Sequence, residues 1–365
     1  MLFACYCAVH FLVAKGLNAL LVLQQLSSRE KPQISVIVAA RNEETNIGRC
    51  LQSLVQQNYP SGLFEVIIVD DGSTDGTAAI IRNYQLQHPF VKLVKVERIS
   101  SDLPPKKNAL NEAIKESRFD ILAFTDADCI APTNWLPSLA KEFLPEVGFV
   151  AGYSPVEQRF PRTFFARWGD LFLRYLEIKN SVGAAAGVGL RNAYLCTGRN
   201  LAYRKRVFQE VNGYEKIKHS ISGDDDLFIQ LVQKETHWKI RYMISPESYV
   251  ETIPPSSFQA FVNQRKRHFS AGKYYPRRMK IIFSLLHSYN ALALLSIFIF
   301  PPIGIIALTG KFIVDVAIFS KGTALFGNTR LRQSVVPLEI VSVLYNFLIG
   351  PLGFFGSFSW KGSKS

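Results

Sequence analysis

The stretch Phe119-Asp120-Ile121-Leu122-Ala123-Phe124-Thr125-Asp126-Ala127-Asp128-Cys129 is an apolar run that stops at two carboxylates, Asp126 and Asp128. A short run rich in aromatic and branched residues predicts a strand that is buried on both faces. The two acids then lie at its carboxyl end, where open α/β sheets bind their ligands. A divalent cation, Mg²⁺ or Mn²⁺, would relieve their repulsion and join them to a substrate phosphate. The plainer alternative is a solvated turn, because Asp is common where strands end.

Upstream of this strand, the chain alternates between buried strands and amphipathic helices. Further strands are predicted over residues 34–40, 64–69 and 91–96. Helices are predicted over 46–57 and 106–117, with another that is capped by Ser73 or Thr74 and runs to Tyr84. Such alternation is typical of a doubly wound, mostly parallel sheet in an α/β domain.

Polar side chains follow several of these predicted strands. Because the carboxyl ends of parallel strands share one edge of a sheet, we expect a single ligand-binding face. It would gather the segment from Ala39 to Glu43 (with Arg41 among it), Asp70, Asp71, Lys106, Asp126 and Asp128. The chain has no Gly-x-Gly-x-x-Gly and no Gly-Lys-Ser/Thr segment, which argues against a dinucleotide-binding fold and a P-loop.

A second acidic cluster lies about a hundred residues further on, in Ser222-Gly223-Asp224-Asp225-Asp226-Leu227. Apolar residues then follow at helical spacing, so the acids occupy a predicted helix N-terminus. Favourable interaction with the helix dipole is the plainer explanation, worth about 0.3–1 kcal/mol for each acid. Three adjacent acids are more than capping requires, and a carboxylate near an acceptor hydroxyl could take its proton.

Four motifs, taken in order, resemble those of family 2 glycosyltransferases, which have the GT-A fold. They are AARNE (39–43), VDDGSTD (69–75), KKNAL (106–110) and TDAD (125–128), and the resemblance covers about residues 33–272. It implies a Rossmann-like nucleotide-sugar domain in which Ala39, Arg41 and Glu43 line the nucleoside pocket. It also implies that Asp70 or Asp71 meets a uracil-like base, that Lys106 approaches the diphosphate, and that Asp126 and Asp128 bind the metal.

The same resemblance assigns roles in the second half of the domain. It implies that Asp225, with Asp224 as the second choice, is the catalytic base. The segment 196–203 corresponds to an acceptor-side strand, with Gly198 and Asn200 facing the acceptor. Gln264-Arg265-Lys266-Arg267-His268 resembles a Gln-x-x-Arg-Trp motif in which Gln264 and Arg267 would meet the donor diphosphate. His268 stands where Trp is usual, which argues against polymer synthesis.

The charge and hydropathy of the chain point to a membrane. The net charge is +13 and hydrophobic residues make up 48% of the chain. Residues 261–280 carry seven Lys or Arg and no acid, directly before an apolar run, as the positive-inside rule expects beside a span. An anionic membrane surface therefore explains the charge better than nucleic acid does, and we expect no nucleic-acid partner.

Three regions are predicted from these patterns. Residues 1–26 form an N-terminal membrane anchor helix, or an interfacial helix because Lys15 interrupts the run. Residues 33–275 form the catalytic domain, and residues 281–358 form a C-terminal transmembrane region of two or three helices. The five cysteines are scattered without metal-ligand spacing, which favours reduced thiols and a catalytic domain that faces the cytoplasm.

The predicted function is that of a multi-pass, cell-membrane, inverting glycosyltransferase. It would use a nucleotide sugar, with UDP as the expected nucleotide, and a lipid or other hydrophobic acceptor at the cytoplasmic membrane face. One alternative is a processive polysaccharide synthase. An alternative of another class is a membrane scaffold that keeps the fold but has lost catalysis.

Overall fold

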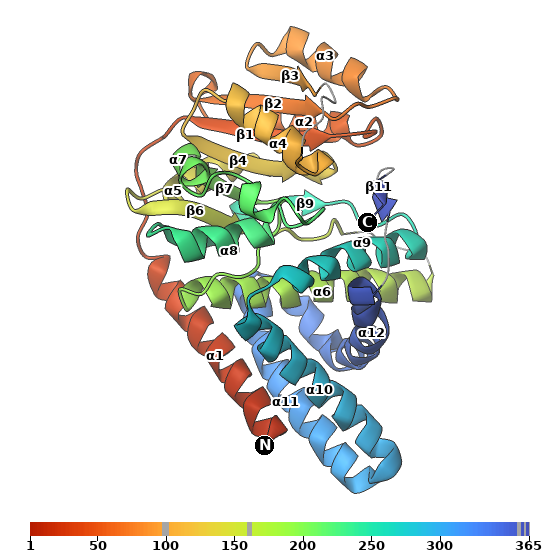
Figure 1. Cartoon of the computed structure of the whole chain (residues 1–365). Helices are drawn as coiled ribbons and strands as arrows, with labels where there is room; N and C mark the ends of the chain where they lie inside the picture. The colour runs from red at the N-terminus through yellow and green to blue at the C-terminus, as the bar shows by residue number, and fades with distance from the viewer. Residues whose placement is uncertain (97–101, 159–162, 356–358, 361–362, 365) are drawn as a thin grey trace. The chain divides into compact units, whose positions relative to one another are not determined.

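The computed structural model describes residues 1–96, 102–158, 163–355, 359–360 and 363–364, with side chains as far as residue 349. The chain divides into two compact units (Figure 1). We call residues 20–157 and 191–253 the sheet unit, and residues 1–19, 158–190 and 254–365 the helical unit. Residues 158–190 and 254–275, which the predicted catalytic domain included, therefore group with the helical unit. The predicted domain boundaries stay a prediction.

The sheet unit is built on the predicted strands. Apolar runs form β1 (Ile34–Ala40), β2 (Phe64–Asp70), β3 (Val91–Lys95) and β4 (Ile121–Asp126), and each begins and ends within two residues of its predicted bounds. These four strands pair in parallel, with β1 between β2 and β4. Every residue of β2 is buried, as expected for a strand that helices cover on both faces.

The full sheet has seven strands in the order β3-β2-β1-β4-β7-β6-β8. Strand β7 (Leu201–Arg204) is antiparallel to both β4 and β6 (Val147–Gly152), and β8 (Lys239–Met243) is parallel to β6. The predicted α/β fold with a mostly parallel sheet is confirmed. The strand order reverses between β1 and β4, the strand that ends at Asp126, and such switch points are where open α/β sheets bind ligands.

Helices connect and cover these strands. They are α2 (Ile47–Val55), α3 (Thr77–Gln87), α4 (Pro105–Glu116), α5 (Trp135–Glu142), α7 (Lys205–Glu210) and α8 (Asp226–Glu235). A small antiparallel pair, β5 (Cys129–Ile130) with β9 (Glu251–Thr252), follows directly after Asp128. One contiguous apolar core lies between the sheet and α2 and α5, with Trp135, Leu51 and Ile68 among its fully buried residues.

The predicted start of α3 was wrong. The helix begins at Thr77 with Gly76 as its N-cap, and neither Ser73 nor Thr74 caps it. The reason is a cross-link between two loops: Ser73 Oγ accepts from the N–H of Asn42 at 3.0 Å, and the N–H of Thr74 donates to Asn42 Oδ1 at 2.8 Å. Ser73 and Thr74, which were expected to cap the helix, instead hydrogen-bond to Asn42 and so join the loops that follow β1 and β2.

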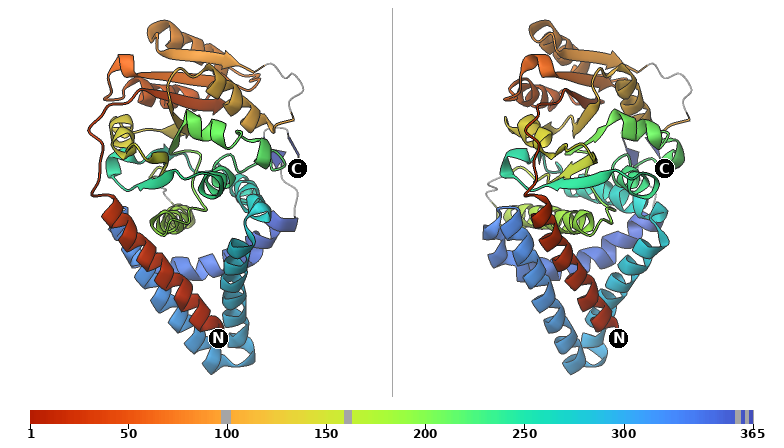
Figure 2. Two further views of the ribbon diagram at one scale, coloured as in Figure 1. Left: turned by 60° about the vertical axis from the view of Figure 1, so that its left-hand side comes forward. Right: turned by 90° about the vertical axis from the view of Figure 1, so that its left-hand side faces the viewer.

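The helical unit consists of long helices (Figure 2). They are α1 (Leu2–Leu23), α6 (Phe164–Gly189), α9 (Phe258–Ala271), α10 (Arg277–Ile299), α11 (Pro301–Leu325) and α12 (Val335–Phe355); a short hairpin, β10 (Ser359–Trp360) and β11 (Ser363–Lys364), follows. Within the described residues, α1, α10 and α11 are long and apolar enough to cross a membrane. Only Phe300 separates the end of α10 from Pro301, the first residue of α11. Residues 356–358 of the last predicted span lie outside the described part of the chain.

A cluster of buried charges joins four helices of this unit, and we call it the ion cluster. Lys311 Nζ pairs with Asp315 one turn along α11, and with Glu339 Oε1 of α12 at 2.7 Å. Lys179 of α6 also pairs with Glu339 Oε1, at 2.8 Å, and Tyr6 of α1 donates to Asp315. Buried charges are tolerated when they are paired in this way, and removing one partner would leave another uncompensated.

Candidate active site

Strand register brings the predicted donor-side residues to one edge of the sheet. Ala39 of β1 lies opposite Asp126 of β4, and Ala40 lies opposite Asp70 of β2. The N–H of Asp71 donates to the carbonyl oxygen of Ala40 at 2.9 Å, which continues the β1–β2 pairing by one residue. The convergence expected at the strand ends is therefore a direct result of parallel pairing.

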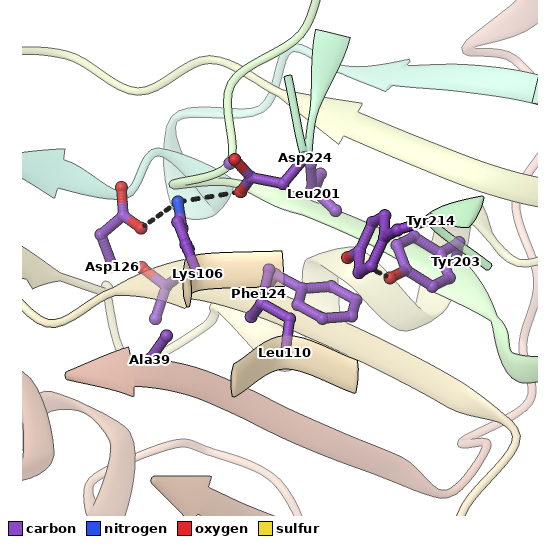
Figure 3. Close-up of a pocket in the computed structure, with 11 residues that line it drawn as sticks. Ala39, Lys106, Leu110, Phe124, Asp126, Leu201, Tyr203, Tyr214 and Asp224 are labelled. Atoms are coloured by element: carbon purple, nitrogen blue, oxygen red, sulfur yellow. Dashed lines mark hydrogen bonds and ion pairs between the residues drawn. The ribbon is translucent and has the colours of Figure 1, made fainter. Parts of the chain in front are cut away.

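Lys106 lies between the two acidic clusters (Figure 3). Its Nζ is 3.1 Å from Oδ1 of Asp126 and 2.9 Å from Oδ2 of Asp224, so one ammonium group neutralises an acid from each cluster. The adjoining cavity has a volume of only about 10 Å³, room for about one water molecule. Its lining includes Ala39, Phe124, Gly198 and Tyr214 as well as these charged residues. This cavity lies at the point where the two acidic clusters meet.

The acids of the second cluster have distinct partners. Asp225 is the N-cap of α8: its Oδ1 accepts from the N–H of Asp226 at 2.7 Å, and its Oδ2 accepts from the N–H of Gly198 at 2.8 Å. Asp226 Oδ1 accepts from the N–H of Leu227 at 2.8 Å. Capping therefore accounts for Asp226 and for one oxygen of Asp225, whereas Asp224 faces Lys106.

Burial and neighbouring charge change the acidity of two of these carboxyl groups. Burial and then the Asp224 carboxylate raise the pKa of Asp225, against the opposing effect of Lys106 and two backbone N–H groups. Burial, followed by the Asp126 and Glu43 carboxylates, raises the pKa of Asp128. Both groups therefore hold a proton more readily than an exposed Asp would, as groups at functional sites often do.

The residues around Asp128 fit a divalent metal ion. Asp126 and Asp128 offer carboxylate oxygens, and the repulsion that raises the pKa of Asp128 would be relieved by a cation. No group of three or more His, Cys, Asp or Glu side chains that could hold a metal is found in the described part of the chain. Two carboxylates are nonetheless enough for Mg²⁺ when substrate phosphates supply further oxygens. The metal ligands predicted from the sequence stay a prediction.

The loops after β1 and β2 form the predicted nucleoside side of the site. Arg41 Nη1 lies 3.5 Å from Asp71 Oδ2, and Asp70 Oδ1 accepts from the N–H of Ser73 at 2.9 Å. The N–H of Glu43 donates to Thr77 Oγ1 at 2.8 Å. These contacts hold the two loops together, so Arg41, Glu43, Asp70 and Asp71 all belong to one connected segment of the site.

Asn200 lies in the interior, whereas the sequence analysis expected it on the acceptor side. It is fully buried; its Nδ2 donates to the carbonyl oxygens of Tyr153 and Ser248, both at 2.8 Å, and its Oδ1 accepts from Trp135 Nε1 at 3.0 Å. These bonds join three segments beside β7. Gly198, in contrast, lines the cavity, and a Cβ there would lie 3.5 Å from both Asp225 Oδ2 and Lys106 Nζ.

Two predicted donor-side residues belong to the helical unit. Gln264 and Arg267 lie on α9, where both are partly buried. Between them in sequence, Arg265 is buried and its Nη2 lies 3.1 Å from Glu177 Oε1 of α6, which fixes α9 against α6. The donor-binding role of Gln264 and Arg267 stays a prediction.

Sequence reasoning assigned no role of their own to two residues that shape the site. Asn42 joins the β1 and β2 loops and has φ +52, a left-handed conformation that Asn adopts more readily than most residues. Lys107 is fully buried beneath the second acidic cluster. The sequence did contain an indication that Lys107 is buried. It lies on the same helical face as Leu110 and Ile114, three and seven residues further along α4.

Comparison with solved structures defines the class of fold. The mannosyltransferase PcManGT from Pyrobaculum calidifontis, solved with GDP-Man and Mn²⁺, aligns over 95% of this chain and 99% of its own with a TM-score of 0.52 and 21% identity. At this level of identity the likeness concerns the fold, and it confirms the predicted GT-A-like arrangement.

Sequence comparison defines the family. Residues 35–211 match the family model described as Glycosyl transferase family 2. The β-monoglucosyldiacylglycerol synthase of Synechocystis sp. is 29% identical over 66% of this chain and 48% of its own length. The poly-β-1,6-N-acetyl-D-glucosamine synthase of Staphylococcus epidermidis is 33% identical over 39% of this chain and 33% of its own. The chain belongs to glycosyltransferase family 2, and it spans about half the length of its diacylglycerol-modifying relative.

Proposed function

We propose that this protein is a membrane-bound inverting glycosyltransferase that moves a sugar from a nucleotide sugar to a lipid or other hydrophobic hydroxyl. The observation that carries the proposal is the convergence of Asp126 and Asp224 on Lys106, at distances of 3.1 and 2.9 Å. A donor site and an acid–base site would then share one centre. Family membership supports the reaction class.

On the donor side, the loops that carry Arg41, Glu43, Asp70 and Asp71 would enclose the nucleoside, with UDP as the proposed nucleotide. Lys106 would turn from the two acids to the donor diphosphate, and Gln264 and Arg267 would add contacts to the same phosphates. A solved protein of this fold, PcManGT, holds GDP-Man and Mn²⁺, so the fold can accept a donor and metal of this class.

Asp126 and Asp128 would hold the divalent cation, Mg²⁺ or Mn²⁺. When bound, such an ion supplies positive charge to the leaving diphosphate. Lys106 would share that work, since its ammonium already lies 3.1 Å from Asp126.

Asp225 is proposed as the base, with Asp224 as the second choice. The acceptor oxygen would attack the anomeric carbon, its proton would pass to the Asp225 carboxylate, and the bond from that carbon to the diphosphate oxygen would break on the opposite face. This single displacement inverts the anomeric centre. The raised pKa of Asp225 supports the choice, because a base whose pKa lies closer to neutrality accepts a proton more effectively. We propose a positioning role for Asn200, whose polar atoms bond to protein partners, and an acceptor-side role for Gly198.

A hydrophobic acceptor is supported by three helices that are long and apolar enough to cross a membrane. The related Synechocystis protein is named for a glucosylated diacylglycerol, a product of this kind. We propose that the catalytic domain faces the cytoplasm at the cell membrane, since seven basic residues precede α10.

A processive polysaccharide synthase is the second candidate, because the matched Staphylococcus epidermidis protein is named for a polymer. His268 in place of the expected Trp counts against it. The length of the product on a gel would separate the two activities. A catalytically inactive scaffold would show no turnover of the donor with either Mg²⁺ or Mn²⁺ present.

The decisive experiment incubates membranes that contain the protein with labelled nucleotide sugars and Mg²⁺ or Mn²⁺, and then examines the lipid extract. We expect one labelled lipid from wild type and none from Asp225→Asn, which should still bind donor. Full turnover by Asp225→Asn would remove Asp225 from the role of base. If Asp225→Asn also lost donor binding, the loss of transfer would not separate proton acceptance from donor binding. The matched control is therefore Asp226→Asn, which alters a neighbouring capping acid.

A further inference from the structure

The second lysine of the Lys106-Lys107 pair is fully buried, and its ammonium group hydrogen-bonds to three backbone carbonyl groups of one short loop. Its Nζ lies 2.8 Å from the carbonyl oxygen of Ile217, 2.6 Å from that of Ser220 and 2.9 Å from that of Ser222. Residues 218–222 lead directly into Gly223, Asp224 and Asp225. The ammonium group therefore lies inside the loop that carries the second acidic cluster.

The number of contacts matches the chemistry of the group. An ammonium has three N–H donors and no acceptor, and here three carbonyl oxygens lie within hydrogen-bond distance. The carbonyl oxygen of Ile217 also accepts from the N–H of Ser220 at 3.3 Å, whereas those of Ser220 and Ser222 belong to buried residues and need a donor. One ammonium group thus donates hydrogen bonds to three carbonyl groups of the same loop.

The loop has little regular structure to hold it otherwise. No helix or strand covers residues 218–225, and the chain turns at Gly223, which has φ +85. A Cβ on Gly223 would lie 2.5 Å from the Leu227 side chain, so the turn also packs closely on α8. Asp224 follows at once and lies 2.9 Å from Lys106.

The two adjacent lysines of α4 therefore have different partners: Lys106 contacts the carboxylates, and Lys107 contacts the backbone that presents them. We propose that Lys107 is a positioning residue for the reaction, which holds the 217–225 loop so that Asp224 and Asp225 face Lys106 and Gly198. The proposal deepens the proposed function and rests on it.

The charges around Lys107 are consistent with this arrangement. Burial lowers the pKa of Lys107 to about 8, while the carboxylates of Asp224, Asp225 and Asp226 oppose the change and Lys106 adds to it. Below that pH the group has three donors for three carbonyls. Above it, the neutral amine has two donors, and one carbonyl loses its partner.

The test uses the full-length protein in detergent and compares Lys107→Met with wild type by hydrogen–deuterium exchange. We expect amide exchange in residues 217–226 to rise at least about 10-fold, as for a local opening that has become easier, with the β1, β2 and β4 amides unchanged. Lys115→Met, on the exposed side of the same helix, is the matched control and should change neither region. Unchanged protection of residues 217–226 in Lys107→Met would overturn the proposal.

Kinetics add a readout that general destabilisation would not produce. Lys107→Met should lower kcat for sugar transfer about 10- to 100-fold and leave the KM for donor within about 2-fold, since the three hydrogen bonds described for Lys107 go to the 217–222 loop. Equal losses in donor binding and kcat would instead mean that Lys107 merely supports the fold. If wild type transfers no sugar, the proposed function fails. The exchange experiment would still show whether Lys107 holds the 217–225 loop in place.

Wild type alone provides a second measurement should Lys107→Met fail to fold. Protection of residues 217–226, corrected for intrinsic exchange, should fall as the pH rises through about 8, because the ammonium then loses its proton. Protection that stays level across this range, while the sheet amides also stay level, would count against the proposal.

Discussion

The amide nitrogen of Gly198 lies 2.8 Å from Oδ2 of Asp225, so the segment before β7 is hydrogen-bonded to the N-terminus of α8. One oxygen of Asp225 thus meets Gly198 while the other caps its own helix. The carboxylate is fixed in orientation beside Gly198, a residue that lines the same cavity as Lys106. Fixed orientation and raised pKa together make Asp225 the first residue to test.

The raised pKa of Asp225 predicts a loss of activity at acid pH. A base must be ionised to accept a proton, so kcat/KM should fall as the pH drops through a pKa that lies above the ordinary value of about 3.9 for Asp. Asp224→Asn removes the neighbouring carboxylate that raises this pKa, and the acid limb should then move to lower pH. A pH profile of kcat/KM for both proteins measures the shift, and an identical limb in the variant would contradict the assignment.

Asp128→Asn should separate metal binding from stability. The variant lacks one carboxylate of the crowded Asp126, Asp128 and Glu43 group, so without metal it should melt at least as high as wild type. Wild type should gain about 2.7 kcal/mol of unfolding free energy from Mn²⁺ at 100 times its Kd, and the variant should gain much less. Thermal melts with and without Mn²⁺ measure both effects. Equal stabilisation of the two proteins by Mn²⁺ would show that Asp128 does not bind the ion.

Lys106→Met removes the ammonium group that lies 3.1 Å from Asp126 and 2.9 Å from Asp224. Loss of a group that stabilises transition-state charge typically lowers kcat about 10²- to 10³-fold, and we expect a loss of that size. Lys115→Met is the control, because its exposed ion pair with Glu112 at 2.7 Å contributes little. Initial rates at saturating donor give the comparison, and a loss below about 3-fold would place Lys106 outside the catalytic machinery.

Gly16 and Gly169 offer the same substitution in two environments. A Cβ at Gly16 of α1 would lie 2.3 Å from the carbonyl oxygen of Ala186 on α6, so Gly16→Ala should force these helices apart and cost about 1–3 kcal/mol. A Cβ at Gly169 of α6 would meet nothing within 4 Å, and Gly169→Ala should stabilise the helix by about 0.5–1 kcal/mol. Melting temperatures in one detergent should therefore move in opposite directions. Shifts of the same sign would mean that α1 does not pack on α6 as described.

The parts of the fold that could be predicted from sequence are those that rest on local pattern. Continuous apolar runs gave β1, β2 and β4 to within two residues, since strands buried on both faces need no polar alternation. Parallel pairing then brought the strand-end residues together, as expected for Asp70 and Asp126.

The parts that could not be predicted depend on partners far away in sequence. Ser73 looked like a helix cap, but the N–H of Asn42 takes its oxygen. Asn200 lies in a motif associated with the acceptor, yet bonds to Trp135 and Tyr153 bury it. Lys107 was missed because a lysine is ordinarily a surface residue, and only the convergence of three distant carbonyls makes its burial favourable.

The ion cluster has a consequence for how charge is balanced between helices. Lys311 and Asp315 are one helical turn apart, so α11 carries its own counter-charge. Glu339 has no such partner on α12 among the described side chains; its cations are Lys311 of α11 and Lys179 of α6, at 2.7 and 2.8 Å. The charge of Glu339 on α12 is therefore compensated by two helices that precede it in the chain, and loss of Lys311 or Lys179 would remove part of that compensation.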